Sequence, residues 1–174
     1  PAYAAKRSVN IAILSDAKLE RSNIDSASLK QEISSLLGRE FNVSFDERYR
    51  YGGDWDLAKI QALSDKALAD NSIDLIVAMG VINANYFASQ ALNKPVIAPF
   101  ILDPELQGLK MVDGRSGVKN FTYITQGGRP TQFIAKLQQI THFTNTAVLV
   151  EDAVMKNIPK LQGLLDRFND LGMH

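Results

Sequence analysis

Three aspartates have the side chains and positions best suited to chemistry in this sequence. Asp16, Asp54 and Asp103 each fall where a predicted strand ends. Ligands of an open parallel sheet bind at the carboxyl ends of its strands, so paired carboxylates there could transfer protons or hold a metal ion. Asp103 precedes Pro104, a pair that more often forms a turn. Acid–base catalysis, metal binding and turn formation are therefore the alternatives to be separated.

The residues that would complete a catalytic site are missing from the sequence. A phosphoacceptor site needs adjacent acids after the first strand and an acid after the third, but these strands end at Ser15-Asp16 and at Gly80. The chain has no cysteine and two histidines, of which His142 lies beside Phe143. It contains no nucleophile elbow. It also lacks both glycine-rich phosphate-binding motifs, G-x-x-x-x-G-K-[ST] and a G-x-G-x-x-G after a strand. We therefore expect a binding protein and not an enzyme, with no metal and no cofactor.

Charge and composition narrow the class of partner. The 174 residues carry 19 Lys and Arg against 19 Asp and Glu, and 45% of them are hydrophobic. A balanced charge with no dense basic cluster argues against nucleic acid as a partner. No apolar run reaches the roughly 18–20 residues that span a bilayer. We expect residues 1–8 to be a disordered N-terminus, in which Ala2-Tyr3-Ala4 is either the remnant of an export signal or an alanine-rich end.

Short apolar runs alternate with amphipathic segments along the chain, and this alternation predicts the order of strands and helices. Strands are predicted at 9–14, 41–45, 73–79, 95–100, 121–125 and 146–150. Helices are predicted at 26–37, with Ser26 as the N-cap, and at 56–69, 83–92, 131–140 and 153–171. Pro159 marks either a kink or the first turn of the last helix.

Single helices between successive strands imply right-handed crossovers. The predicted fold class is therefore α/β, an open parallel sheet with helices on both faces. We expect a ligand-binding lobe at 9–125, a glycine-rich linker at 126–130 and an αβα unit at 131–174. Because one strand cannot build a sheet, the strand at 146–150 must join the first sheet, pair with another molecule or begin a second lobe.

Two features at the predicted strand ends favour ligand binding. Gly80 lets the backbone approach a ligand closely, and the helix that follows offers free N–H groups to an anion or a carbonyl. Trp55, the only tryptophan, could stack on a planar or apolar ligand. The alternative is that Trp55 anchors the start of the second helix, with Asp54 as the N-cap of that helix.

An ordered set of motifs resembles a known protein family. The motifs are Gly53-Asp54, the run IDLIVAMG that ends at Gly80, the run KPVIAPF that ends at Phe100, Asp103-Pro104 followed by Gly108-Leu109, and the run NFTYI that begins at Asn120. In this order they are similar to the ABC-transporter substrate-binding proteins of the uncharacterised or tryptophan/tyrosine-type group. That family has the type I periplasmic-binding fold, whose lobes are flavodoxin-like. The similarity spans roughly residues 9–150 and departs from the family at Tyr123 and at 81–85.

The resemblance implies a site, a function and a location. The family's cleft-lining positions fall on Ser15, Asp16, Gly80, Val81, Asn83, Phe100 and Asp103, with Trp55 and Thr125 as further candidates. The implied protein is a solute-binding lobe exported to the periplasm or envelope of a bacterium. It would bind a small molecule, such as an aromatic or apolar amino acid, for an ABC-type transporter. The resemblance also implies that residues 131–174 are the start of an incomplete second lobe.

A second function remains open at this point. Related lobes resemble a segment that precedes TolC-like outer-membrane efflux domains, so the alternative is a non-catalytic interaction or assembly domain that has lost its ligand. An incomplete αβα unit exposes an apolar helix face and an unpaired strand edge. We therefore expect a homodimer formed through residues 131–171.

Overall fold

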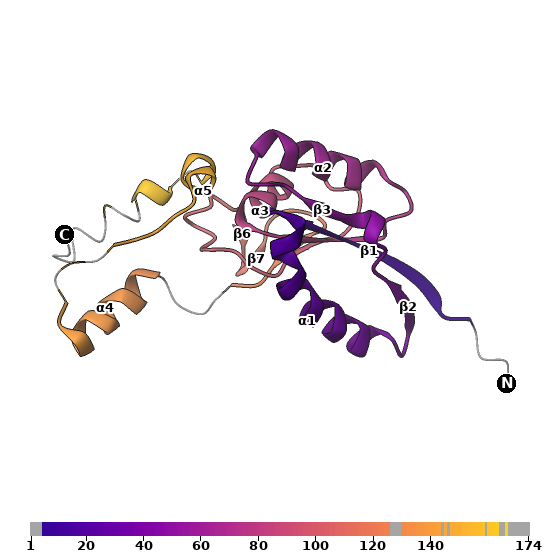
Figure 1. The fold of residues 1–174 in the computed structure, drawn as a ribbon, viewed down its shortest axis with the longest axis horizontal. Helices are drawn as coiled ribbons and strands as arrows, with labels where there is room; N and C mark the ends of the chain where they lie inside the picture. The colour runs from indigo at the N-terminus through magenta and orange to yellow at the C-terminus, as the bar shows by residue number, and fades with distance from the viewer. Residues whose placement is uncertain are drawn as a thin grey trace.

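Six parallel strands form the central sheet of the structure, which is a computed structural model (Figure 1). It describes residues 5–125, 130–143, 145, 147–158, 160–163 and 166, and of 19–25, 130 and 131 the backbone alone. The strands are β1 (Arg7–Ser15), β2 (Phe41–Ser44), β3 (Arg50–Gly52), β4 (Leu75–Met79), β5 (Val96–Ala98) and β8 (Phe121–Tyr123). Their order is β2-β1-β4-β5-β8, with β3 also beside β1, and every pairing is parallel. The predicted open parallel sheet is confirmed.

β1 lies inside the sheet because its side chains are apolar on both faces. Ile11 and Ile13 point to one face, Ala12 and Leu14 point to the other, and all four are buried. β2 pairs with the first half of β1 and β3 pairs with its last three residues. The sequence analysis predicted β2 and missed β3, because a three-residue strand shows no hydrophobic alternation.

Helices cover both faces of the sheet, as predicted. α1 (Leu19–Leu37) packs through Leu29 and Ile33 on the face that carries Ile11 and Ile13. α2 (Leu57–Ala69) and α3 (Val81–Ala88) cover the opposite face, where the Phe87 side chain is fully buried. The carboxyl ends of β1, β3 and β4 therefore open towards the loops that lead into these three helices.

Three helices differ from the predicted ones at their ends. α1 begins at Leu19, so Ser26 is a buried residue inside the helix and not its N-cap. α3 begins at Val81 and ends at Ala88, so it starts and ends earlier than the predicted 83–92. Asp56, and not Asp54, caps α2, because the Asp56 carboxylate accepts a hydrogen bond from Lys59 N at 2.8 Å.

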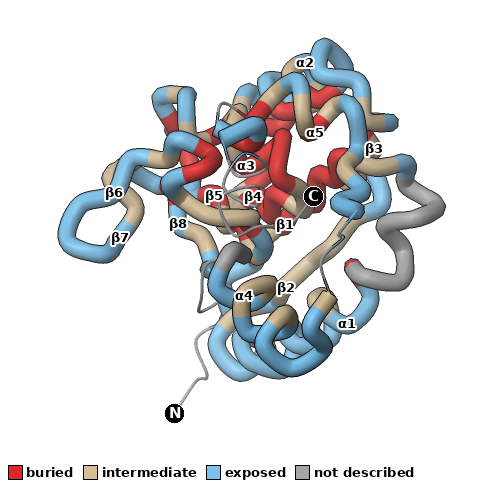
Figure 2. Tube along the Cα trace, turned by 90° about the vertical axis from the view of Figure 1, so that its left-hand side faces the viewer, coloured by how far each residue is buried: buried red, intermediate tan, exposed pale blue. Residues whose placement is uncertain are grey.

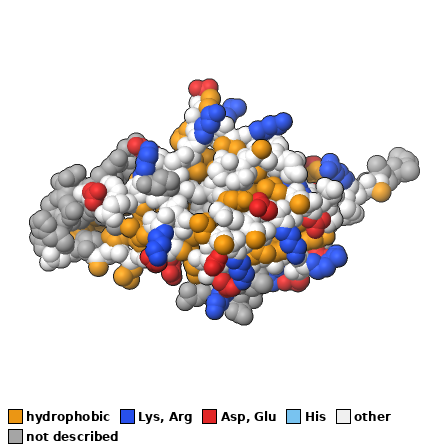
Figure 3. Space-filling model, turned by 90° about the horizontal axis from the view of Figure 1, so that it is seen from above, with side chains coloured by type: hydrophobic (Ala, Val, Ile, Leu, Met, Phe, Trp, Pro, Cys, Tyr) orange, Lys and Arg blue, Asp and Glu red, His pale blue; other side chains and the backbone are white. Residues whose placement is uncertain are grey.

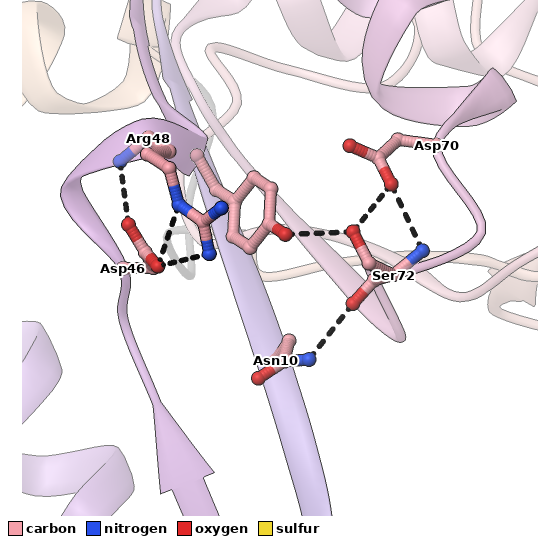
Figure 4. A network of polar contacts seen from close by, with 6 residues as sticks. Asn10, Asp46, Arg48, Asp70 and Ser72 are labelled. Carbon is pink, nitrogen blue, oxygen red and sulfur yellow. Dashed lines mark hydrogen bonds and ion pairs between the residues drawn. The ribbon is translucent and has the colours of Figure 1, made fainter.

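Polar side chains anchor the amino end of β4, at the far side of the sheet from the loops just described. Asn10 Nδ2 donates to Ser72 O at 2.9 Å, and Ser72 N donates to the Asp70 carboxylate at 2.9 Å (Figure 4). The Tyr49 and Ser72 hydroxyls lie 2.6 Å apart. Hydrogen bonds from Ser72 hold the pKa of Asp70 below its usual range. This network joins β1, the carboxyl end of α2 and the turn before β4, at the edge of the sheet where β4 begins.

Lys94 closes the carboxyl end of α2. Its ammonium group donates to Ala67 O at 3.1 Å and to Asp70 O at 2.6 Å, and the residue is buried. These carbonyls belong to the last turn of α2 and have no partner within the helix, so a cation there satisfies them. Burial lowers the pKa of the Lys94 ammonium.

The loop that connects β5 to β8 contains a two-stranded hairpin, which the sequence analysis did not predict. The hairpin consists of β6 (Met111–Val112) and β7 (Arg115–Ser116). Asp113 and Gly114 form its turn with φ angles of 49° and 72°. Positive φ at both turn residues is typical of a tight hairpin, and the Asp-Gly pair is its usual sequence signal.

The C-terminal part contains α4 (Pro130–Thr141) and α5 (Asp152–Asn157). α4 matches the predicted helix and starts one residue early, with proline in its first position. The predicted strand at 146–150 is wrong for the described positions 147–150, which form no strand. The predicted continuous helix at 153–171 is wrong at 158 and 160, because α5 ends at Asn157, although 161–163 and 166 are helical again. Residues 164, 165 and 167–171 of that prediction lie outside the described residues. Residues 126–129 of the predicted linker, and Pro159, lie outside the described residues.

In Figure 1, α4 stands out from the sheet, whereas α5 lies close to α3. Among the described residues, no helix has both the length and the apolar character that a membrane crossing requires.

Candidate ligand site at the carboxyl edge of the sheet

The loops after β1 and β3 and the end of β4 are joined by backbone hydrogen bonds. Gly53 N donates to Ser15 O at 2.8 Å, and Trp55 N donates to Asp16 O at 2.7 Å. Asp16 N donates to Met79 O at 3.3 Å. These bonds place three loops side by side at the carboxyl edge, where ligands of parallel sheets bind.

The Asp16 carboxylate occupies the amino end of α3. It accepts hydrogen bonds from Ile82 N at 2.8 Å, from Asn83 N at 2.9 Å and from Asn83 Nδ2 at 2.7 Å. The negative charge therefore lies where the dipole of the helix is positive. Gly80, the N-cap residue, has φ 155°, and a Cβ there would lie 2.2 Å from Asp16 Cγ. The close approach of Asp16 thus requires glycine at position 80.

Asn83 and Ser64 complete this buried network. Ser64 Oγ donates to Asn83 Oδ1 at 3.2 Å, which leaves Asn83 Nδ2 directed at Asp16. Asp16, Ser64 and Asn83 are each at most 2% exposed. Burial raises the pKa of Asp16, while the hydrogen bonds from Asn83 and Ile82 act in the opposite direction. The network joins β1, α2 and α3 around one carboxylate.

This arrangement changes what the Gly80 turn can offer a ligand. The sequence analysis expected free N–H groups at the start of α3, but Ile82 N and Asn83 N both donate to Asp16. An anionic ligand group would have to displace that carboxylate. Val81, which begins the helix, presents an apolar side chain next to the turn and is 7% exposed.

Trp55 belongs to an apolar cluster along the same edge. The buried members of this edge cluster are Ile60, Val81, Ile82, Leu106, Val154, Ile158 and Leu161. Trp55 and Leu102 pack against it and are partly buried. These contacts agree with the interpretation that Trp55 anchors the start of α2, and its stacking on a ligand stays a prediction. Asp54 contributes no cap there and pairs with the Lys59 ammonium.

The remaining predicted residues lie at or after the carboxyl ends of β1, β5 and β8 and differ in accessibility. Ser15 is buried, and its hydroxyl accepts a hydrogen bond from Ala17 N at 3.2 Å. Phe100, after β5, is 41% exposed. Thr125, after β8, is exposed at the end of the sheet. Phe100 and Thr125 are thus accessible to a ligand, whereas Ser15 is buried beneath the loops of this edge.

Asp103 forms a turn. Its carboxylate accepts hydrogen bonds from Glu105 N at 2.8 Å and from Leu106 N at 3.0 Å, the pattern of an Asx turn. This geometry supports the turn-forming interpretation of the Asp-Pro pair over the catalytic one. The turn places Leu106 in the edge cluster.

Gln107 is a site residue that the sequence analysis missed. It is 2% exposed, its Oε1 accepts from Leu102 N at 2.6 Å, and its Nε2 donates to Asn85 Oδ1 at 2.8 Å. The side chain therefore connects the loop after β5 to α3. A lone glutamine between two turns carries no pattern that predicts such a role.

The three aspartates do not form an acidic pair. Asp16 is buried and bonded to amide groups, and Asp54 pairs with Lys59. The Asp103 carboxylate accepts hydrogen bonds from the backbone of the turn that it begins. Among the described residues, no group of three His, Cys, Asp or Glu side chains could hold a metal ion. What the edge offers in this part of the chain is an apolar surface with aromatic side chains and a buried carboxylate.

Comparison with known proteins supports the fold. The chain is similar to the crystal structure of an ABC domain in complex with L-Trp from Streptococcus pneumonia, with a TM-score of 0.69 and 16% sequence identity. The similarity covers 97% of this chain and 55% of that one, so the present chain spans about half the length of this structure. No protein-family model matches the sequence. No curated protein matches it either. At this identity the comparison shows a shared α/β fold.

Proposed function

We propose that this chain is a small-molecule-binding domain whose ligand binds at the carboxyl edge of the sheet. The observation that carries the proposal is that Trp55 lies beside Asp16 and the Gly80 turn at the carboxyl edge of a parallel sheet, where Phe100 also follows the end of β5. The structural neighbour is described as a complex with L-Trp, which supports a ligand of similar size and aromatic character. No step of catalysis is part of the proposal.

The chemistry of the edge favours an apolar or aromatic solute. Trp55, Val81 and Leu102 belong to one apolar cluster, and the Phe100 side chain is accessible after the end of β5. The Asp16 carboxylate already uses the N–H groups at the start of α3, so a ligand carboxylate gains no anion site there. We therefore propose that contact between rings and apolar side chains provides most of the binding free energy.

The cellular role belongs to the same proposal. A solute-binding domain of an ABC-type transport system, exported to the periplasm or envelope of a bacterium, would present such an edge to a transporter. The ordered motifs around Gly80, Phe100 and Asp103 support this role, and so does the Ala2-Tyr3-Ala4 sequence. The membrane transporter would be the protein partner.

Isothermal titration with L-tryptophan, L-tyrosine, L-phenylalanine and small apolar solutes tests the proposal. At least one of these is expected to bind, and Trp55→Ala is expected to weaken that binding about tenfold or more, as loss of an aromatic contact in a pocket does. Phe133→Ala is the matched control, because Phe133 is an exposed aromatic residue on α4. Absence of binding by every solute, or equal effects of the two substitutions, contradicts the proposal.

A second candidate function is a non-catalytic interaction domain of an outer-membrane efflux protein. It is favoured by the apolar side chains that α4 exposes, Phe133, Leu137 and Ile140, which recur at helical spacing on one face. Leu149 is 96% exposed in a segment where 147–150 form no strand. Figure 3 shows hydrophobic side chains at the surface on the side where α4 and α5 lie. We propose a homodimer through residues 131–171 for this candidate, since identical unpaired segments can pair across a two-fold axis.

A further inference from the structure

The carboxyl edge is covered by the chain's own C-terminal segment. Val154, Ile158 and Leu161 are 7%, 3% and 3% exposed, and they belong to the edge cluster with Val81 and Ile82 of α3. Figures 1 and 2 show α5, which carries Val154, next to α3. We call residues 152–158, 160 and 161 the strap.

The apolar side chains of the strap face α2, α3 and the loop after β5, and its charged side chains face solvent. Val154, Ile158 and Leu161 are all buried in the edge cluster, so they lie on one side of the strap although α5 ends at Asn157. Asp152 and Lys156 form an exposed ion pair on the other side. The segment is therefore shaped to lie on an apolar surface, and the carboxyl edge is the surface that it uses.

Side-chain packing is the principal attachment of the strap that the described residues show. Among the described residues, one backbone hydrogen bond joins the strap to the loop after β5, from Lys160 N to Leu106 O at 3.2 Å. The residues at 147–150, which lead into the strap, form no strand. A segment held by a few apolar contacts opens more easily than one held by a ladder of hydrogen bonds.

We infer that the strap is a movable cover that occupies the carboxyl edge in place of a ligand, so that a ligand binds the edge only when the strap is displaced. Trp55 packs against the same cluster as Val154 and Ile158. An apolar ligand that reached Trp55 would compete for the surface on which the strap lies. The second part of the inference rests on the proposed function, whereas the position and mobility of the strap do not.

The fluorescence of Trp55, the only tryptophan in the chain, reports the position of the strap without any ligand. In Ile158→Asp, a buried apolar anchor becomes a charge, so the strap is expected to lift. Trp55 emission should then shift to longer wavelength, and its quenching constant with acrylamide should rise about twofold, as local opening exposes it. Leu149→Asp is the matched control, because it adds the same charge at a 96% exposed position. Unchanged emission and quenching in Ile158→Asp overturn the inference.

Hydrogen exchange distinguishes local opening from global unfolding. In Ile158→Asp the amides of the strap should exchange faster, while those of β1 and β4 keep their protection. If Ile158→Asp does not fold, Ile158→Ala provides the same comparison with a smaller perturbation. Loss of protection throughout the sheet in Ile158→Ala would show that the strap is part of the core and would overturn the inference.

Titration with L-tryptophan, followed by calorimetry, separates this inference from the proposed function. If the strap competes with the ligand, Ile158→Asp should bind about tenfold more tightly than the wild type, because the open state no longer has to be formed at binding. Equal affinity of the two proteins overturns the competition and leaves the proposed function intact. Absence of binding to both proteins contradicts the proposed function. The fluorescence measured without ligand then still tests whether the strap is movable.

Discussion

The Asp16 carboxylate accepts hydrogen bonds from both the backbone N–H and the side-chain amide of Asn83, at 2.9 and 2.7 Å. The two residues lie 67 positions apart, one after β1 and the other in the first turn of α3. A residue of a neighbouring strand thus caps this helix, a role that a preceding side chain usually has. The same carboxylate blocks the N–H groups that a ligand anion would use.

Replacement of Asp16 by alanine is expected to lower the free energy of unfolding. Asn83 N, Asn83 Nδ2 and Ile82 N would lose their acceptor inside the protein, which costs about 3 kcal/mol in total. Asp152→Ala is the control, since Asp152 is in an exposed ion pair with Lys156. Urea denaturation followed by circular dichroism measures both. Equal stability of the Asp16→Ala and Asp152→Ala proteins would contradict the capping role of Asp16.

The pH dependence of stability is expected to carry a contribution from Asp16. Burial raises the pKa of Asp16 above its ordinary value of 3.8, so the folded protein holds this proton more tightly than the unfolded chain. Between the two pKa values unfolding releases the proton, and the contribution of Asp16 to the free energy of unfolding falls as pH rises.

Asp16→Asn removes this titration and provides the comparison. The free energy of unfolding of the wild type minus that of Asp16→Asn is expected to decrease as pH rises from about 4, and then to become constant above the raised pKa. Urea denaturation at a series of pH values measures the difference. A difference that increases over this range would show that the pKa of Asp16 is lowered in the folded protein.

Gly80→Ala is expected to be more destabilising than Gly114→Ala. Both glycines have positive φ, 155° and 72°. A Cβ at Gly80 would also collide with the Asp16 carboxylate, whereas nothing lies within 4 Å of a Cβ at Gly114. We expect a loss of about 1 kcal/mol for Gly114→Ala and about 3 kcal/mol for Gly80→Ala. Thermal denaturation compares them, and equal losses would indicate that backbone conformation alone requires Gly80.

Lys94→Met is expected to destabilise the end of α2. Methionine keeps most of the apolar stem but leaves Ala67 O and Asp70 O without the ammonium that they accept from. The expected loss is about 2 kcal/mol, measured by urea denaturation. Lys119→Met, at an exposed position of the loop before β8, should change stability by less than about 0.5 kcal/mol. A similar small effect at Lys94 would contradict its role as a cap.

The sequence predicts the sheet well where local pattern determines structure. β1 and β4 are apolar, β-branched runs buried on both faces, and such runs are recognisable without knowledge of their partners. The run at 146–150 has the same local character, but the described residues 147–150 pair with no strand. β-propensity describes how well side chains fit a sheet, and a segment without a neighbour does not become a strand.

The sequence predicts where the candidate residues lie along the sheet but not how their side chains are oriented, and their binding of a ligand stays a prediction. Asp16, Gly80 and Asn83 were correctly expected at strand ends, because chain order and sheet topology determine that placement. The direction of the Asp16 side chain depends on Asn83 and Ser64, which are distant in sequence and follow no motif. The covering of the edge by Ile158 was not predicted either, since a helical hydrophobic spacing does not identify the surface that it contacts.

The location of ligand binding tests the central claim most directly. Two-dimensional ¹H–¹⁵N spectra of the labelled chain, titrated with L-tryptophan and small apolar solutes, report on every backbone amide. The account predicts that the largest shift changes occur at Trp55, Val81 and Ile82 and in the strap, with little change in the β6–β7 hairpin. Spectra that do not change with any solute, or changes confined to residues away from the carboxyl edge, would contradict it.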